Sequence, residues 1–596
     1  MLIPLLLSSA PAFGQNQLSK FAAEFKNADL SGNLNVIVQY NNAPTDADHS
    51  AVAAQGGRLT RRMSKLSSGG YSVPGYSIAS LANNPNVAHV SVDHQVHAHL
   101  DLVTAATNAT VAWQQYGAKG NGIGVAVIDS GIGPNSDLSG NVVYTQDFTG
   151  GNGTDAYGHG THVAGIIAGS GAASHCATCT RNFQGMAPGA KLINLRVLDV
   201  NGVTSDSILI SAIDRAIALK TTYNIRVINL SVGRPIFESY TVDPVCQAVE
   251  QAWKAGIVVV VAAGNDGRLN NSGNKGYYTI NAPANDPYVI TVGAMKTMAT
   301  ATRTDDAIAS YSSKGPTFGD FVAKPDLLAP GNLIASTTPS TAATLKTSAN
   351  KVPTNYYDSK GTGTASPYYV ILSGTSMAAG VVSGAVADLL QVQPNLTPDQ
   401  VKIRLMQTSY KGFPTSTNST DATTGTSYLS YYDAFTRGAG YLDVAAALAS
   451  NDTPMGNSLS PTVGANGTTA FMTFDKNATW NPIWFFKSTS AANTWSPSAL
   501  GFGNTIMLQP VAASTLFSAL NVITAAAGGS TSASSSVWGN SSVWGNSSVW
   551  GNSSVWGNSS VWGNSSVWGN SSVWGNSSGW GDTTTAAASS LVQDNN

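Results

Sequence analysis

Ser376 lies in residues 372–380, LSGTSMAAG, where small neighbours allow other backbone to approach its hydroxyl closely. The apolar run that follows, residues 381–390, predicts a buried helix. Ser376 would then stand at a helix N-terminus, where free N–H groups and the helix dipole favour a developing negative charge. Because serine is also a common helix cap, this stretch alone marks Ser376 only as a candidate nucleophile.

A nucleophilic serine needs a general base, and the base needs an acid that orients it. Residues 124–129, GVAVID, form a strand-like apolar run that ends on Asp129 and continues into a glycine turn. Residues 158–165, GHGTHVAG, place His159 at the start of a small-residue helix. The chain therefore offers all three groups that such a site requires.

The contexts DSG, HGTHVAG and GTSMA, in the order Asp, His, Ser, resemble those of the subtilisin-like serine proteases. The resemblance implies that Asp129 orients the base, that His159 is the general base and then acid, and that Ser376 attacks the scissile carbonyl. We expect His162, the second histidine of its motif, to pack in the core. A Gly-x-Ser-x-Gly elbow is excluded by Ala378, and the chain order excludes the chymotrypsin arrangement.

An oxyanion needs hydrogen-bond donors as well. Asn265 follows the predicted strand 256–263, and in the family the Asn of AAGN donates beside the backbone N–H of the nucleophile. The resemblance thus gives Asn265 this role, although residues 265–267 could also form a simple turn. The related acid-active sedolisins have a carboxylate at this position, so the amide of Asn265 argues that the chain is not one of them.

By the same resemblance the substrate binds as an added strand, held through its main chain. Residues 231–233 would pair with the residues before the scissile bond, and residues 201–203 would form the opposite rail. Small walls predict a roomy apolar pocket for the residue before the cut. The expected substrate-binding residues are Gly202, Ser231, Val232, Gly233, Ala262, Ala263 and Gly264.

Strands and helical runs alternate between residues 105 and 450, which predicts an α/β catalytic domain with a mostly parallel sheet and helices on both faces. Active sites of such sheets gather at the carboxyl ends of strands, where Asp129 and Asn265 both fall. An insertion rich in Ser, Thr and Tyr, at about residues 337–370, would border the cleft.

Two segments precede this domain. Residues 1–14 contain an apolar run and a small-residue site that resemble a signal peptide, without the usual positive start. Residues 15–104 predict a small α+β domain that resembles the family's inhibitory propeptides, with its last strand in the substrate cleft. Cleavage between residues 98 and 106 would then release the enzyme, whereas the alternative is an ordinary accessory domain.

Composition restricts the partners and the compartment. The 596 residues carry 30 Lys and Arg against 32 Asp and Glu, and charged residues make up 10% of the chain. This balance gives no indication of a nucleic-acid or anionic-membrane partner. The resemblance implies that the partners are protein or peptide substrates and the chain's own propeptide. A surface built from Ser, Thr, Asn and Gly fits a secreted or cell-surface protein.

The three cysteines and one aspartate bear on cofactors. Cys176 and Cys179 predict a small loop disulfide that leaves Cys246 free, with a metal site or a redox pair as alternatives. Asp137 resembles an aspartate that binds structural calcium in many family members, but residues 170–182 replace the partner loop, which argues against calcium. We expect no metal site, and the chemistry requires no cofactor.

The C-terminal region falls outside the resemblance. Residues 451–530 are rich in Ser, Thr and Ala and give no fold assignment, and residues 583–596 predict a flexible tail. Between them, residues 531–582 repeat the hexapeptide Ser-Val-Trp-Gly-Asn-Ser. Because six is even, an extended chain would present every Trp on one side, as a ladder for glycans, a cell surface or self-association. A flexible low-complexity segment is the alternative.

Together these features predict a secreted serine endopeptidase that hydrolyses peptide bonds through an acyl-enzyme on Ser376 and is released from its propeptide by autoprocessing. One rival is a catalytically silent adhesion protein that acts through the Trp repeat. The other is an esterase or peptide ligase on the same scaffold.

Overall fold

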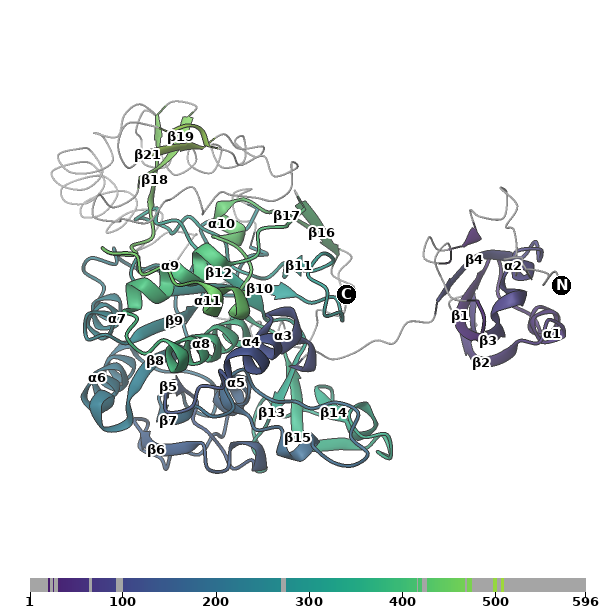
Figure 1. The fold of residues 1–596 in the computed structure, drawn as a ribbon, viewed down its shortest axis with the longest axis horizontal. Coiled ribbons are helices and arrows are strands. Elements are labelled where there is room, and N and C mark those ends of the chain that lie inside the picture. Colours follow the sequence, from purple (N-terminus) through teal and green to yellow (C-terminus); the bar gives the residue numbers. More distant parts are fainter. Residues whose placement is uncertain are drawn as a thin grey trace, which may run out of the picture. The chain divides into compact units, whose positions relative to one another are not determined.

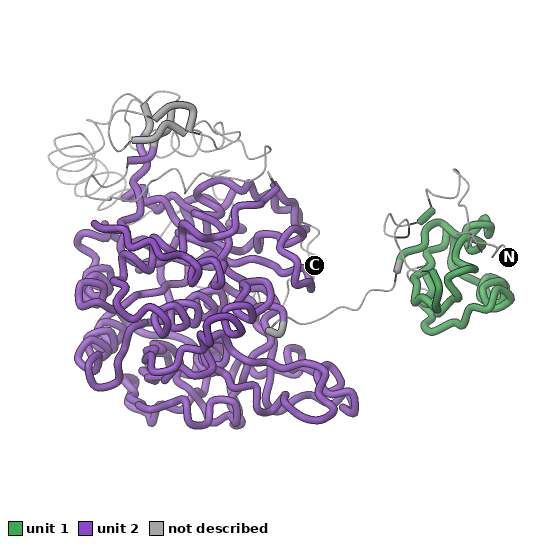
Figure 2. Tube along the Cα trace, viewed as in Figure 1, with its two compact units in different colours: residues 1–97 green, residues 98–596 purple. Residues whose placement is uncertain are grey.

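The structure is a computed structural model, and it describes residues 20–21, 25, 30–63, 67–92, 100–269, 275–414, 416–420, 426–466, 469–473, 497–500 and 505–508. The chain folds into two units, residues 1–97 and 98–596 (Figure 2). The boundary lies before helix α3 (Leu100–Ala106), not at residue 104 as the sequence suggested. The reason is that Val103 is buried in the core of the second unit. The predicted signal peptide, Trp repeat and tail lie outside the described residues.

The first unit is an antiparallel sheet with two short helices, the α+β character that its sequence predicted. The strand order is β2-β3-β1-β4, and alternate residues of β1, including Val36 and Val38, are fully buried. Thr45 and Asp48 form a capping box at the start of the first helix. The elements are β1 (Asn33–Tyr40), α1 (Asp46–Ala54), β2 (Arg58–Met63), β3 (Ser68–Pro74), α2 (Ile78–Leu81) and β4 (Val87–Val92).

The second unit is organised around an eight-stranded sheet in the order β11-β10-β9-β8-β5-β7-β6, with β12 also paired to β10 (Figure 1). All of these pairs are parallel except β10 with β11. The mostly parallel α/β fold is thus confirmed. The strands are β5 (Gly124–Asp129), β6 (Val142–Asp147), β7 (Lys191–Arg196), β8 (Ile225–Leu230), β9 (Val258–Ala262), β10 (Ile290–Lys296), β11 (Ala307–Ile308) and β12 (Leu327–Pro330).

Helices cover both faces of this sheet, since every residue of β5 and of β9 is buried. Helix α8 (Thr375–Val392) packs against β8, β9 and β10 and against α5 (His159–Ala168). Nearly all of α8 is buried, although its length and hydropathy would suit a membrane span. The remaining helices of this unit are α4 (Ala109–Tyr116), α5 (His159–Ala168), α6 (Asp206–Tyr223), α7 (Pro244–Lys254), α8 (Thr375–Val392), α9 (Pro398–Thr408), α10 (Ala434–Arg437) and α11 (Val444–Ala449).

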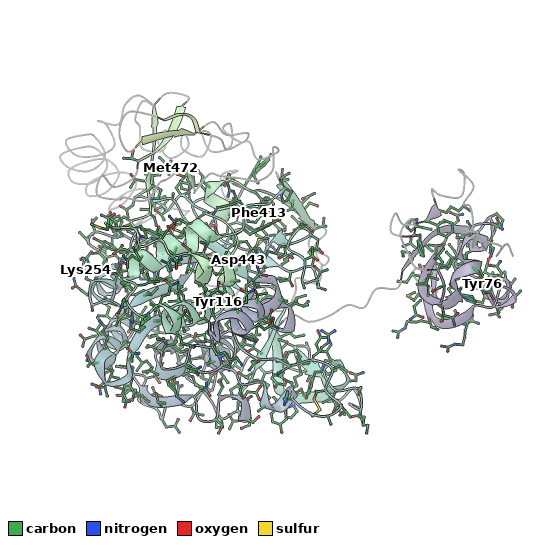
Figure 3. The ribbon with its side chains drawn as sticks, viewed as in Figure 1. Tyr76, Tyr116, Lys254, Phe413, Asp443 and Met472 are labelled. Atoms are coloured by element: carbon green, nitrogen blue, oxygen red, sulfur yellow. A yellow bond between two sulfur atoms is a disulfide. The ribbon has the colours of Figure 1, made fainter. Side chains whose placement is uncertain are left out.

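Asp443, labelled in Figure 3, holds the end of the domain to its start. Its carboxylate caps α11, accepts a hydrogen bond from Asn108 at 3.0 Å, and forms an ion pair with Arg303 at 2.7 Å. The domain also continues past the predicted limit at residue 450, because Pro461 O accepts from Ala323 N at 2.7 Å.

Three smaller sheets complete the described fold. The first, in the order β13-β15-β14, belongs to the insertion before the candidate serine. The second is a hairpin and the third has the order β18-β19-β21-β20. Their strands are β13 (Ile334–Thr337), β14 (Lys351–Pro353), β15 (Ala365–Leu372), β16 (Ser416–Thr420), β17 (Ser427–Tyr431), β18 (Thr462–Asn466), β19 (Thr469–Thr473), β20 (Pro497–Leu500) and β21 (Thr505–Leu508).

Candidate active site

A buried acid and an imidazole meet where β5 ends and α5 begins. Asp129 is the last residue of β5 and His159 is the first residue of α5. The Nδ1 of His159 donates to Oδ1 of Asp129 at 2.8 Å, and the same oxygen accepts from Ser130 N at 2.7 Å. This bond holds the proton on Nδ1, so Nε2 is the nitrogen left to accept a proton.

The environment of His159 favours its protonated form. Burial lowers the pKa of His159, but the Asp129 carboxylate and its hydrogen bond, with a smaller contribution from Asp155, raise this pKa above its ordinary value. His162 differs: it is fully buried, its Nε2 bonds to Ile334 O at 3.0 Å, and burial lowers its pKa to about 3. His162 is thus a neutral core residue, as predicted.

Asp155 holds the first turn of α5 in place, and the sequence analysis missed it. Its Oδ1 accepts from Gly158 N at 2.6 Å and from Ser130 Oγ at 2.8 Å. Its Oδ2 accepts from Thr161 N at 2.8 Å and from Thr161 Oγ at 2.6 Å. The N-cap of α5 is Gly158, and Asp155 lies three residues before it, so no standard capping pattern marks Asp155 in the sequence.

Ser376 is the second residue of α8 and is nearly buried. Its hydroxyl donates to Ser231 O at 3.3 Å, and Ser231 Oγ donates to Ser376 O at 3.0 Å. In this conformation, therefore, the hydroxyl of Ser376 bonds to a carbonyl and not to His159.

Helices α5 and α8 nevertheless bring the two side chains to neighbouring helix ends. A Cβ at Gly380 would lie 3.5 Å from Val163 Cγ1, and a Cβ at Gly384 would lie 3.3 Å from Ile167 O. The two contacts are four residues apart in both helices and come in the same order along the chain, so α5 and α8 run parallel here. Ser376 and His159 lie one turn before these contacts, each on its own helix, and are therefore neighbours.

Asn265 lies just beyond β9, beside the start of α8. Its Oδ1 accepts from Thr375 N at 3.0 Å and from Thr375 Oγ at 3.1 Å. The backbone N–H can only donate, so the amide oxygen must be the atom that faces Thr375. The NH₂ group of Asn265 is left as the free donor next to Ser376.

Two of the predicted substrate-binding glycines, one in a rail and one in the pocket wall, have a positive φ and no room for a side chain. Gly202 has φ +77°, and a Cβ there would lie 2.6 Å from Cζ of Tyr157. A Cβ at Gly264, which has φ +109°, would lie 2.8 Å from Nδ2 of Asn281. Of the other predicted residues, Ser231, Ala262 and Ala263 are buried and Val232 is partly exposed.

A polar side chain from another loop lies next to two of the predicted substrate-binding glycines. Asn281 lies against both Gly264 and Gly233, since a Cβ at Gly233 would be 3.2 Å from its Cβ. Its amide donates to Asp266 Oδ2 at 3.2 Å. Polar groups that come from another loop therefore line part of this wall.

The insertion before Ser376 borders the site, as its position suggested. Leu345 N donates to Tyr157 O at 2.8 Å, and Thr344 N donates to Ala156 O at 3.0 Å. Thr344 Oγ also donates to Val200 O at 2.9 Å. The insertion thus joins the segment before His159 to the segment before Gly202.

Asp137 is engaged by protein donors, which do not fit a calcium site. Its Oδ2 accepts from the Tyr369 hydroxyl at 2.6 Å and its Oδ1 accepts from Ala173 N at 2.7 Å. Calcium requires several oxygen acceptors, whereas the groups that face this carboxylate are an O–H and an N–H. No cluster of three or more His, Cys, Asp or Glu suited to a metal occurs among the described residues.

The disulfide predicted between Cys176 and Cys179 is present, and Cys246 is free and buried. The disulfide loop is joined to the insertion, since Ser359 N donates to Thr178 O at 2.9 Å.

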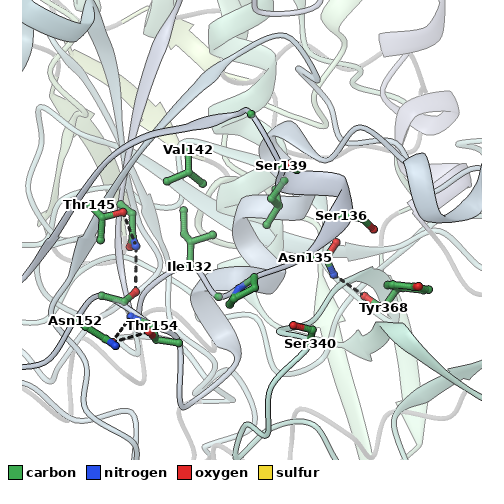
Figure 4. A pocket seen from close by; sticks show the side chains of 16 residues that line it. Ile132, Asn135, Ser136, Ser139, Val142, Thr145, Asn152, Thr154, Ser340 and Tyr368 are labelled. Atoms are coloured by element: carbon green, nitrogen blue, oxygen red, sulfur yellow. Dashed lines mark hydrogen bonds between the residues drawn. The ribbon is translucent and has the colours of Figure 1, made fainter.

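A hollow of about 580 Å³ lies beside β6, lined in part by Ile132, Val142 and Tyr368 (Figure 4). Its polar walls are bonded internally: Asn194 donates to Gly153 O at 3.1 Å and Asn135 donates to Tyr368 O at 3.1 Å. None of the candidate catalytic residues lines the hollow, so it is separate from the site described above.

These positions place a hydroxyl, an imidazole and an orienting carboxylate at neighbouring strand and helix ends of a parallel α/β sheet, the arrangement of a serine hydrolase. Residues 120–431 match the Subtilase family, Peptidase_S8. The chain therefore belongs to the subtilase family and is a serine endopeptidase.

Curated relatives agree with this assignment. Serine protease AprX of Bacillus subtilis (strain 168) is 36% identical over 362 residues, which cover 58% of this chain and 74% of that protein. Subtilisin E of the same strain is 30% identical over 363 residues, 60% of this chain and 79% of that protein. The Extracellular serine proteinase of Thermus sp. (strain Rt41A) is 33% identical over 348 residues, 56% of this chain and 68% of that protein.

Proposed function

We propose that this endopeptidase cleaves peptide bonds through an acyl-enzyme on Ser376. Nε2 of His159 takes the hydroxyl proton as the serine oxygen attacks the scissile carbonyl carbon, and Asp129 stabilises the imidazolium that forms. His159 then gives this proton to the leaving amine. In the second half of the reaction His159 takes a proton from water, the water attacks the acyl group, and His159 returns the proton to Ser376 as the acid product leaves. The observation that carries the proposal is the buried Asp129–His159 hydrogen bond, 2.8 Å long, at the start of the helix that packs along α8.

The proposal requires one small movement. In this proposal, rotation about χ1 of Ser376 would replace the 3.3 Å hydrogen bond to Ser231 O with a hydrogen bond to Nε2 of His159. Catalytic hydrogen bonds are often loose before the substrate binds, and a long bond to a carbonyl costs little to break.

Asn265 and the backbone N–H of Ser376 are proposed to bind the oxyanion. Thr375 fixes the amide oxygen of Asn265 by two bonds, which leaves the NH₂ group oriented before the reaction begins. The substrate main chain would lie between residues 201–203 and residues 231–233, where Gly202 and Gly233 leave room for close approach. No metal or cofactor takes part in these steps.

The first unit is proposed to be an inhibitory propeptide, and the mature enzyme to be secreted. A separate core in residues 1–97 supports the first point. The Cys176–Cys179 disulfide and a relative named as extracellular support the second. Because α3 packs with the catalytic unit, we place the cleavage before Leu100, within the predicted window. The Trp repeat is proposed to contact glycans or a cell surface.

Incubation of the purified precursor tests autoprocessing. Mass spectrometry should find a fragment that ends just before Leu100 in the wild type and no such fragment in Ser376→Ala. A fragment that appears equally in both would show that another protease makes the cut. N-terminal sequencing of the protein from the culture medium tests secretion, and deletion of residues 531–582 should abolish retention on cell walls if the repeat binds them.

A further inference from the structure

The side chain of Arg234 joins the two segments between which the substrate main chain would lie. Arg234 directly follows residues 231–233, one of the two rails. Its Nε donates to Oδ1 of Asp206 at 2.9 Å and to Oδ2 of Asp206 at 3.1 Å. Asp206 is the first residue of α6 and comes three residues after the other rail, residues 201–203. The ion pair between Arg234 and Asp206 therefore connects one rail to the other.

The place of this ion pair along the rails follows from the contacts of Ser231. The hydroxyl of Ser376 donates to Ser231 O, and Ser231 Oγ donates to Ser376 O, so this end of the rail lies next to the nucleophile. Arg234 comes three residues later, and three residues span up to about 10 Å. The ion pair thus lies at the end of the rail away from Ser376, beside substrate residues well before the scissile bond.

Arg234 is itself firmly held. Its Nη2 donates to Oδ2 of Asp243 at 2.9 Å, and Asp243 is fully buried and caps α7. Its backbone N–H donates to Ala282 O at 3.0 Å, and its backbone carbonyl accepts from Ala282 N at 2.8 Å. Burial lowers the pKa of Arg234, but the hydrogen bonds and charges of Asp206 and Asp243 raise this pKa above its ordinary value. The guanidinium therefore stays charged and gives Asp206 a fixed partner.

The rail at residues 201–203 has less support of its own. It belongs to a turn that is bonded in large part to itself, since Asp199 Oδ1 accepts from Asn201 N at 2.8 Å and from Val203 N at 2.9 Å. Asn201 and Val203 are both exposed. An exposed turn with few packed contacts opens easily unless its ends are held. Asp206 holds the end of this segment that leads into α6.

We propose that Arg234 is a positioning residue, whose ion pair with Asp206 fixes the separation of the two substrate rails. A substrate strand between the rails must lie about 4.7–4.9 Å from each of them, because only this spacing allows main-chain hydrogen bonds on both sides. Without the ion pair, residues 201–203 would have to be ordered when the substrate binds, and this ordering lowers affinity. The inference rests on the function proposed above, since it concerns the substrate of the same site.

Two peptide p-nitroanilides with the same last two residues test the proposal, a tetrapeptide that reaches the far end of the rails and a dipeptide that does not. Asp206→Ala removes the ion pair and leaves the bond between Arg234 and buried Asp243, so the variant should fold. We expect KM for the tetrapeptide to rise about five- to tenfold, with kcat within about twofold of the wild type, and KM for the dipeptide to stay unchanged. Asp214→Ala, exposed on the same helix, is the matched control and should change neither KM.

A second variant tests the pair from its other side. Arg234→Lys keeps the charge but cannot bond to Asp206 and Asp243 at once, so it should raise KM for the tetrapeptide to a similar extent. Combined with Arg234→Lys, Asp206→Ala should add little further increase, because both changes break the same contact.

Three results would overturn the assignment. They are an unchanged KM for the tetrapeptide in Asp206→Ala, an equal rise of KM for both peptides, and effects of the two substitutions that multiply in the double variant. Each of these results would leave the Ser376 mechanism intact, whereas hydrolysis that survives in Ser376→Ala would refute the mechanism itself.

Discussion

Removal of the Asp155 carboxylate should destabilise the helix that carries His159. Asp155 accepts four hydrogen bonds of 2.6–2.8 Å, and two of their donors are backbone N–H groups at the start of α5. A hydrogen bond to a charged group contributes about 1.5–3 kcal/mol. Because bonds within one network do not add, we expect Asp155→Ala to lower the free energy of unfolding by about 4 kcal/mol.

Asp155→Asn gives a graded version of the same change. The side chain keeps its shape, but its NH₂ group must face donors that now lack an acceptor. We expect a loss of about 2 kcal/mol, between the parent and Asp155→Ala. Turnover should fall in both variants, with kcat affected more than KM, because the displaced group is the base and not a substrate contact.

Denaturant unfolding in a Ser376→Ala background measures these losses without autolysis, and kcat is measured with the serine intact. Asp214→Asn, exposed on α6, is the control and should change the unfolding free energy by less than about 0.5 kcal/mol. If Asp155→Ala unfolds at the same denaturant concentration as its parent, the network does not hold α5 and the reasoning is wrong.

Three further predictions concern ionisable groups. The pKa of His159 is raised, and its neutral form is the active one, so the acid-side fall of kcat/KM should have its midpoint above pH 6.5. Asp129→Asn should move this midpoint to lower pH. A wild-type midpoint below pH 6.5 would contradict the reasoning. A calcium chelator should leave the melting temperature unchanged, whereas Tyr369→Phe should cost about 1–3 kcal/mol by removing a donor from buried Asp137; a chelator that lowers the melting temperature would refute the assignment. Asp388 is fully buried, and within the described part of the chain neither of its oxygens accepts a hydrogen bond of good geometry, since the nearby Trp113 N–H donates to Met186 O. Burial raises the pKa of Asp388, and Trp113 opposes this effect only in part. Because the pKa of Asp388 is raised in the folded state, the free energy of unfolding falls as pH rises above the ordinary value near 3.8. In urea unfolding, Asp388→Asn should therefore be more stable than the parent by about 1–2 kcal/mol at pH 8 and by little at pH 4. The same unfolding curve for variant and parent at both pH values would show that the buried carboxylate is not destabilising.

The sequence predicted the parts of the site that are written in short motifs. Asp129, His159, Asn265 and Ser376 each stand at a strand or helix end that local apolar patterning marks, so their element and their approximate place could be predicted together. The parallel α/β fold followed from the same alternation. The roles of these residues stay predictions until they are tested.

What the sequence did not predict depends on contacts between distant segments. Asn281 and Asp266 are separated by a loop, and nothing in either local sequence indicates that an amide closes the wall behind Gly264. Thr344 contacts Ala156 and Val200, which lie more than a hundred residues away, so the insertion could be recognised but not placed. Domain limits failed for the same reason, since α3 and the segment around Pro461 join the catalytic core through packing.

Labelling with a serine-directed phosphonate tests the central claim most directly. Peptide mass mapping of the labelled wild-type enzyme should find one phosphonate on Ser376, and the rate of labelling should fall by several orders of magnitude in His159→Ala, because the hydroxyl then lacks its base. A label on another serine, or equally fast labelling without His159, would contradict the account.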